Sequence, residues 1–152
     1  MSKKFIPSFL AIFLVFSVAA SQMAFANDVD SLIKERVAGF KKSKKSIEEI
    51  GRAIDKQDNA ALVEQAVWLQ KFAAKIPELY PENAKGGFFS RAKKSIWDNF
   101  DDYKEKAADF NKSAMHLEKL ASANASQNEL TQQLKNLEQS CQSCHKPYRK
   151  GL

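Results

Sequence analysis

The residues whose types and spacing can support chemistry lie together in the segment Cys141-Gln142-Ser143-Cys144-His145. Two thiols stand three positions apart, and a histidine follows the second thiol directly. Thiols at this spacing can add to the two vinyl groups of a haem, and the adjacent histidine then binds the iron as an axial ligand. The segment therefore predicts one haem c per chain, attached covalently through Cys141 and Cys144, with His145 as the iron ligand.

Other kinds of site also contain a Cys-x-x-Cys pair, namely redox dithiols and zinc sites. A thioredoxin-like dithiol is expected at the start of a helix inside a βαβ pattern, whereas this pair closes a helical stretch. A structural zinc site needs four ligands, and His116 is the one further histidine in the chain. These two sites and a simple disulfide remain alternatives that fit the pattern less well.

Residues 1–26 have the pattern of a secretory signal peptide. Two lysines at positions 3 and 4 precede an apolar run over residues 5–20, and the small residues of Ala24-Phe25-Ala26 follow it. The run is shorter than the ~20 residues that span a bilayer, so no membrane anchor is expected after cleavage. We expect a mature domain of residues 27–152 in the periplasm, a compartment that suits haem c because its assembly takes place outside the cytoplasm.

Charge and length describe one domain with a mildly basic surface. Removal of the signal peptide takes away two lysines and no acid, which lowers the formal net charge from +6 to +4. The remaining 126 residues suit a single domain. Because the lysines are scattered without a dense basic run, nucleic-acid binding is not expected.

Apolar residues that recur at three- and four-residue spacing predict four amphipathic helices. The expected helices run from Asp28 or Asp30 to about Ile54, from Asp58 or Asn59 to Pro77, from Ser90 or Ser95 to Ala123, and from about Gln127 to Tyr148. Residues 77–90 form the longest expected non-helical connection. With no strand pattern, the fold class is all-α, an antiparallel up-down-up-down four-helix bundle with the haem in its core.

The apolar seam of the fourth helix contains both cysteines. Its members recur at spacings of four, three, four, three and four: Leu130, Leu134, Leu137, Cys141, Cys144 and Tyr148. His145 follows Cys141 by four residues and therefore lies on the same face. The haem is thus predicted to be inserted between helices. In the first helix, Ser43 and Lys44 interrupt the apolar stripe, and this gap can face a loop or the edge of a cofactor.

The second helix has more apolar surface than one core needs. Val63, Val67 and Ala74 form a second stripe, and Trp68 adds a large ring. One interpretation is a homodimer contact through the first and second helices. The other is that a wide stripe packs on both neighbouring helices.

This arrangement resembles the class II cytochromes c, the cytochrome c′ family of secreted four-helix bundles with Cys-x-x-Cys-His near the C-terminus. The resemblance covers residues 27–152. It is most specific over residues 141–149, which match Cys-x-x-Cys-His-x-x-Tyr-Arg, and over residues 33–36, Ile-Lys-Glu-Arg. Ile96-Trp97 at the expected start of the third helix also fits.

In that family an arginine lies by the haem propionates, and the residue four positions later covers the distal face of the iron. The resemblance therefore places Arg36, Val37 and Phe40 on the distal and propionate side, and Tyr148 and Arg149 on the proximal side. Phenylalanine cannot bind iron. The resemblance thus implies a five-coordinate haem that is open to NO or CO.

The position of His145 leads to the same expectation without the resemblance. Only seven residues follow it, and none is a methionine, so a sixth ligand must come from an earlier helix. Met115 and His116 are the candidates, but they flank the seam residues Ala114 and Leu117, which favours peripheral positions. The alternative is a six-coordinate, low-spin electron carrier that uses one of them as the distal ligand.

These features predict an electron carrier or gas-binding haem protein, not an enzyme. Its expected partners are small redox proteins or membrane electron donors, together with the diatomic gases NO and CO. Peroxidase chemistry needs a distal acid/base group near the iron. With Phe40 at that position, we expect only weak adventitious peroxidase activity.

Overall fold

The computed structural model describes the backbone of residues 11–87 and 90–151, and side chains from residue 28 onward within these ranges. Residues 1–10 of the predicted signal peptide lie outside the described residues, so its cleavage stays a prediction. In the part of the chain that is described, no helix is both long and apolar enough to cross a membrane.

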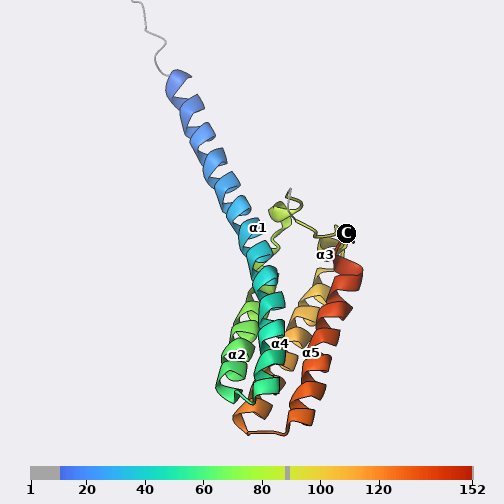
Figure 1. Ribbon diagram of the computed structural model, residues 1–152. Coiled ribbons are helices and arrows are strands. Elements are labelled where there is room, and N and C mark those ends of the chain that lie inside the picture. The colour runs from blue at the N-terminus through green and yellow to red at the C-terminus, as the bar shows by residue number, and fades with distance from the viewer. Residues whose placement is uncertain (1–10, 88–89, 152) are drawn as a thin grey trace, which may run out of the picture.

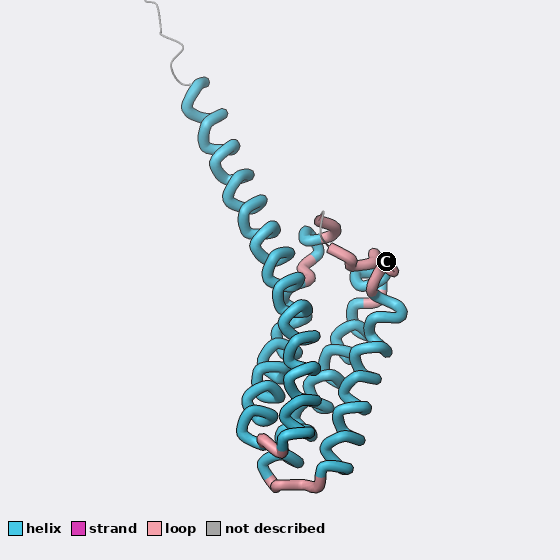
Figure 2. Tube along the Cα trace, in the orientation of Figure 1, coloured by secondary structure: helices cyan, strands magenta, loops and turns pink. Residues whose placement is uncertain are grey.

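Four long helices lie side by side and alternate in direction (Figure 1). They are α1 (Ala11–Lys56), α2 (Asn59–Lys75), α4 (Phe100–Ser122) and α5 (Gln127–Tyr148). Short turns join α1 to α2 and α4 to α5 at one end of the bundle, and the longest connection lies at the other end, near the C-terminus (Figure 2). The predicted all-α, up-down-up-down four-helix bundle is confirmed.

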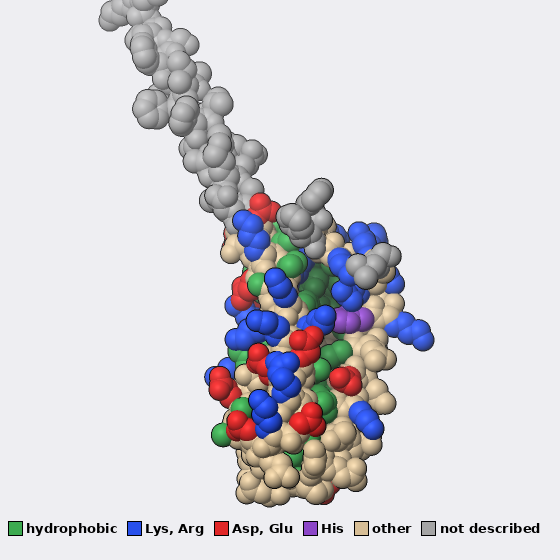
Figure 3. Space-filling model, viewed as in Figure 1, with side chains coloured by type: hydrophobic (Ala, Val, Ile, Leu, Met, Phe, Trp, Pro, Cys, Tyr) green, Lys and Arg blue, Asp and Glu red, His purple; other side chains and the backbone are tan. Residues whose placement is uncertain are grey.

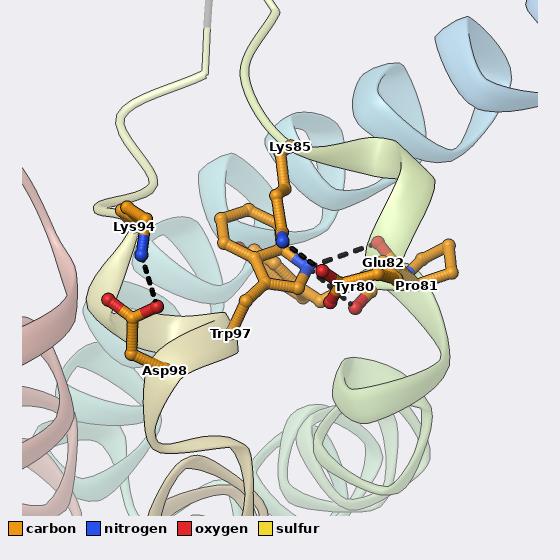
Figure 4. Close-up of polar contacts among 7 residues, drawn as sticks. All are labelled: Tyr80, Pro81, Glu82, Lys85, Lys94, Trp97 and Asp98. Carbon is orange, nitrogen blue, oxygen red and sulfur yellow. Dashed lines mark hydrogen bonds and ion pairs between the residues drawn. The ribbon is translucent and has the colours of Figure 1, made fainter.

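The connection between α2 and α4 contains short helical segments, and the last of them lies within the predicted third helix. They are the 3-10 turns η1 (Ile76–Leu79) and η2 (Glu82–Ala84), and the single-turn helix α3 (Ser95–Asp98). The indole Nε1 of Trp97 donates to the backbone carbonyls of Tyr80 (3.1 Å) and Pro81 (3.0 Å). Figure 4 shows this indole reaching from α3 to the turn before η2, which fixes the two ends of the connection to each other.

Side chains cap two helix starts, and the sequence predicted the first of them at Asp58 or Asn59. The Asp58 side chain accepts from the backbone N–H of Ala61 at 3.0 Å, which caps α2. At α5, Ser126 and Glu129 form a reciprocal capping box. Both caps supply acceptors for N–H groups that have no partner inside the helix.

The predicted start of the first helix at Asp28 or Asp30 is wrong. The backbone is continuously helical from Ala11 through both aspartates to Lys56. No proline lies between these ends, so nothing in the backbone forces a break. In Figure 1 the first turns of α1 extend beyond the other helices.

The prediction of one continuous third helix is also wrong, because Asn99 separates α3 from α4. Its backbone leaves the helical region with φ −133° and ψ 50°. The N–H of Asn99 donates to the carbonyl of Ser95 at 3.0 Å, and its own carbonyl accepts from Tyr103 N–H at 3.0 Å. Asn99 thus ends one helix and begins the next, a role that suits asparagine.

The core follows the predicted periodicity. From α2 it buries Leu62, Ala66, Leu69, Phe72, Ala73 and the following Ile76; from α3 and α4 it buries Ile96, Tyr103, Ala107, Phe110, Ala114 and Leu117; from α5 it buries Leu130, Leu137 and Tyr148. The two cysteines are half-buried against this core. Of the adjacent pairs of long helices, α1 and α5 contact each other least extensively.

Gly39 allows α1 and α2 to approach closely. A Cβ at this position would lie 2.0 Å from Cε2 of Phe72, which is far inside van der Waals contact. Phe72 is buried, so its ring has little room to move away. The absence of a side chain at Gly39 therefore sets the position of the Phe72 ring.

We expect Gly39→Ala to lower the free energy of unfolding by roughly 1–3 kcal/mol, because the new methyl group overpacks the contact with Phe72. Gly51→Ala is the matched control. Its Cβ would meet Leu134 Cδ2 at 3.9 Å, an ordinary contact, so higher helix propensity should stabilise the protein by about 0.5–1 kcal/mol. Denaturant unfolding measures both, and equal effects of the two changes would contradict this account.

Candidate functional site

Two adjoining cavities of about 360 Å³ and 370 Å³ lie between α1 and α5. They share four lining residues: Phe40, Lys44, Cys144 and His145. Figure 3 shows a histidine side chain beside a hollow lined by hydrophobic side chains, with basic side chains around it. Cavities of this size that are mainly apolar and carry a few polar groups are typical ligand sites.

The structure brings all eight predicted site residues to these cavities. The first cavity is lined by Arg36, Val37, Phe40, Cys144, His145, Tyr148 and Arg149, and the second by Phe40, Cys141, Cys144 and His145. Ser43 and Lys44, which interrupt the apolar stripe of α1, line the second cavity. The interruption therefore faces the candidate site.

The two thiols lie on one face of α5 and are half-buried. Burial raises the pKa of Cys141, and burial together with the neighbouring Cys141 raises the pKa of Cys144 to about 11. A redox dithiol is expected to have a lowered thiol pKa instead. Among the described residues, no group of three or more His, Cys, Asp or Glu is placed to hold a metal ion, so the zinc alternative also finds no support.

His145 is half-buried and lines both cavities. Burial lowers the pKa of its imidazole, and the positive charges of Arg149 and Arg91 lower it further. The neutral form is therefore favoured at neutral pH. Neutral imidazole is the form that binds a metal, so the protonation state of His145 suits an axial iron ligand.

The Phe40 ring lies across the cavity from His145, with the two ring centroids 6.2 Å apart. Phe40 meets the edge of Phe72 at 5.1 Å, and Phe72 stacks on Trp68 at 5.4 Å. These contacts fix the ring of Phe40 from the α2 side. A hydrocarbon ring that is held in this way can cover the distal side of an iron atom but cannot bind the iron.

Arg36 is 1% exposed, and its guanidinium binds the connection between α2 and α4. Nη1 donates to the carbonyls of Leu79 (3.3 Å) and Ala84 (3.0 Å), and Nη2 donates to the Gly86 carbonyl and Ser90 Oγ, both at 2.8 Å. The φ of Gly86 is +96°, a backbone conformation that favours glycine. One buried cation thus holds the connection at positions 79, 84, 86 and 90 beside the first cavity.

The Nε atom of Arg36 is buried and has no hydrogen-bond partner among the described residues. An orphaned donor on a buried cation suits an anionic acceptor such as a carboxylate. The cavities therefore offer apolar walls, two thiols, a neutral imidazole and an unused cationic donor. This set fits a haem with its two propionates, although the contact of Arg36 with propionate stays a prediction.

A cluster of three tyrosines forms the inner wall of the first cavity. The sequence predicted Tyr148 as a site residue, but not Tyr80 or Tyr103. The ring centroids of Tyr80 and Tyr103 are 5.0 Å apart, and those of Tyr103 and Tyr148 are 5.2 Å apart. The Tyr148 hydroxyl donates to Asp102 Oδ2. In the sequence, Tyr103 recurs with Phe100, Ala107 and Phe110 at three- and four-residue spacing, which predicts it on the apolar seam of the third helix. Tyr148 lies on the predicted seam of the fourth helix, but Tyr80 lies in the connection, where no periodicity marks it.

Met115 and His116 lie outside the cavities. The side chain of Met115 is 52% exposed, and His116 is exposed on the same helix. Their predicted peripheral positions are confirmed. Among the described residues, neither cavity is lined by a methionine or by a histidine other than His145.

We expect Tyr148→Phe to lower the free energy of unfolding by roughly 1.5 kcal/mol at neutral pH, because a hydrogen bond to a carboxylate is lost. Burial and this hydrogen bond raise the pKa of Tyr148 from 10.0 to about 12. The stabilisation is therefore present below pH 10 and lost as the pH rises through 12. Denaturant unfolding of both proteins across this range measures the difference, and a difference that is absent at neutral pH would contradict the assignment.

Comparison with known proteins gives one family. The family model described as Cytochrome C′ matches residues 31–149. Cytochrome c-556 from Agrobacterium tumefaciens (strain II Chrys) is 38% identical over 77 residues, which cover 51% of this chain and 60% of that protein. The chain spans about three fifths of the length of the curated relatives that it matches.

Solved structures share the fold. Cytochrome c′ from Thermochromatium tepidum superposes with a TM-score of 0.73 at 20% identity, covering 81% of this chain and 97% of that chain. A nitric oxide complex of a mutant cytochrome c prime from Alcaligenes xylosoxidans superposes with a TM-score of 0.70 at 21% identity, with the same coverage. At these identities the structures support the fold, whereas the family model covers most of the sequence: the chain belongs to the cytochrome c′ family.

Proposed function

We propose that this protein is a periplasmic c-type cytochrome with one covalently bound, five-coordinate haem, which transfers single electrons and binds NO or CO. Cys141 and Cys144 would hold the haem through thioether bonds, and His145 would bind its iron. When bound, the haem supplies a one-electron Fe(III)/Fe(II) couple and a binding site for a diatomic gas. The protein chain positions the haem: α5 carries the attachment residues, and α1 covers the face of the haem opposite His145.

The observation that carries this proposal is the ring of Phe40 opposite His145. Phe40 has no atom that can bind iron, and the contact with Phe72 holds it in the cavity. A fixed aromatic ring leaves room for small diatomic ligands and obstructs larger ones by steric contact. The nitric oxide complex among the structural relatives concerns another protein, but it agrees with gas binding in this fold.

An electron carrier or gas-binding protein is favoured over an enzyme because the distal side lacks an acid/base group at Phe40. The six-coordinate alternative requires Met115 or His116 to reach the iron. Both are exposed on α4 and line neither cavity. The proposal therefore assigns no distal protein ligand.

Phe40→Met places a thioether opposite His145, and we expect it to convert the iron to a six-coordinate, low-spin state. Because CO must then displace this ligand, its apparent affinity for the ferrous protein should fall at least tenfold if about 90% of the iron is ligated. Visible spectra of both oxidation states and a CO titration measure the change.

Two controls belong to this experiment. Val37→Met puts the same thioether at a residue that lines the first cavity but is 38% exposed, and it should leave the spectrum unchanged. Met115→Ala combined with His116→Ala should also leave it unchanged. A low-spin spectrum in the unaltered protein that is lost in this double variant would contradict the proposal.

We also propose export by residues 1–26 and a homodimer through α1 and α2. Support for the dimer comes from Val37, which is exposed, and from Val63, Val67 and Trp68, which are only half-buried. A ligand-controlled dimer is described for one structural relative. Light scattering at micromolar concentration tests the interface, and a monomeric mass would contradict it.

A further inference from the structure

Two short segments bring six basic residues together at the end of the bundle that contains the C-terminus. The first segment, residues 91–94, lies between η2 and α3, and the second, residues 146–150, contains the end of α5 and the residues after it. We call this group the basic edge, and its members are Arg91, Lys93, Lys94, Lys146, Arg149 and Lys150. The sequence alone suggested scattered lysines, because the two segments are more than fifty residues apart.

Antiparallel backbone pairing fixes the basic edge. The N–H of Lys93 donates to the Tyr148 carbonyl at 3.0 Å, and the N–H of Lys150 donates to the Arg91 carbonyl at 2.8 Å. Ala92 and Arg149 form an isolated antiparallel bridge between them. This pairing therefore fixes the backbones of Arg91, Lys93, Arg149 and Lys150 relative to one another.

Side-chain hydrogen bonds tie the two segments further. Arg91 Nη2 donates to the Lys150 carbonyl at 2.8 Å, and Lys93 Nζ donates to the Lys146 carbonyl at 3.0 Å. Both acceptors are backbone atoms. The bonds hold the cations in place without neutralising their charge.

The basic edge has an excess of positive charge. Within residues 90–98 and 145–150, Asp98 is the single acid, and it pairs with Lys94. Lysines elsewhere on the bundle more often have an acidic neighbour one turn away; examples are Lys44 with Glu48, Lys104 with Asp101, and Lys112 with Asp109. The excess is therefore concentrated at this edge.

The basic edge adjoins the candidate haem cavity. Arg91 and Arg149 line the first cavity together with His145, and Lys41 and Lys44 line it from α1. A partner that rests on the edge would consequently lie over the cavity. Electron transfer benefits from this placement, because it brings a donor near the haem and sets its orientation.

We infer that the basic edge is the docking surface for a soluble protein redox partner that presents an acidic face. The inference rests on the proposed electron-transfer function. Complementary charge raises the association rate and selects the orientation, and weak redox encounters need only a small interface. An anionic membrane would also be attracted, but a flat bilayer gains nothing from charges arranged around a cavity mouth.

The test uses the holoprotein and a charge-reversed variant, Lys146→Glu with Lys150→Glu. Both lysines are exposed, line neither cavity and contribute only backbone atoms to the bonds above. The matched control is Lys119→Glu with Lys135→Glu, which changes the net charge equally at exposed positions away from the edge. Reduced flavodoxin, an acidic one-electron carrier protein, serves as the probe in stopped-flow measurements.

At low ionic strength we expect the edge variant to react roughly tenfold more slowly than the unaltered protein, and the control less than about twofold more slowly. The difference should shrink at high salt, where exposed charges are screened. Equal slowing of the two variants would overturn the docking surface. A second result would also overturn it: the edge variant alone no longer binds phosphatidylglycerol vesicles, while its rate of reaction with flavodoxin is unchanged.

Haem content and reduction by dithionite separate this inference from the proposed function. If every variant carries haem and is reduced by dithionite, unequal flavodoxin rates support the docking surface and equal rates overturn it while the redox function stands. If the unaltered protein carries no haem, or its haem cannot be reduced, the proposed function and the docking surface both fail.

Discussion

The buried cation of Arg36 is the interaction on which the architecture of the site depends. Removing a charge from water costs several kcal/mol unless other groups replace the water. Here three backbone carbonyls and one hydroxyl accept from the guanidinium, whose carbon lies 4.6 Å from the ring centroid of Tyr80. Because these acceptors lie at positions 79, 84, 86 and 90, a single side chain of α1 holds four points of the connection that borders the cavity. The remaining Nε donor has no partner among the described residues.

The same cavity separates two faces with different chemistry. The α5 face carries two protonated thiols and a neutral imidazole, states that burial favours over the charged ones. The α1 face presents Phe40, supported by Phe72 and indirectly by the missing side chain at Gly39. A haem held on α5 therefore faces a hydrocarbon ring. The coordination chemistry proposed for this protein follows from that asymmetry.

Sequence reasoning predicted the parts of the fold that depend on residue type and spacing. The seam of α4 and α5 placed Tyr103, Leu137 and the cysteines correctly, and Asp58 marked a cap. It failed where backbone atoms or distant segments decide the structure. Asn99 breaks a helix whose apolar period continues across it. The acceptors of Arg36 are mostly carbonyls, which no residue type signals. The basic edge exists only because residues 91–93 pair with residues 148–150.

We propose above all that α5 carries a covalent haem and that no protein ligand binds the iron on the distal side, where Phe40 lies. The most direct measurement is the visible spectrum of the dithionite-reduced protein before and after addition of CO, with the haem content determined as the pyridine haemochrome. We expect one haem c per chain, a high-spin ferrous spectrum, and conversion to a CO complex. A low-spin ferrous spectrum that CO leaves unchanged would contradict it, because a protein ligand would then occupy the position assigned to Phe40.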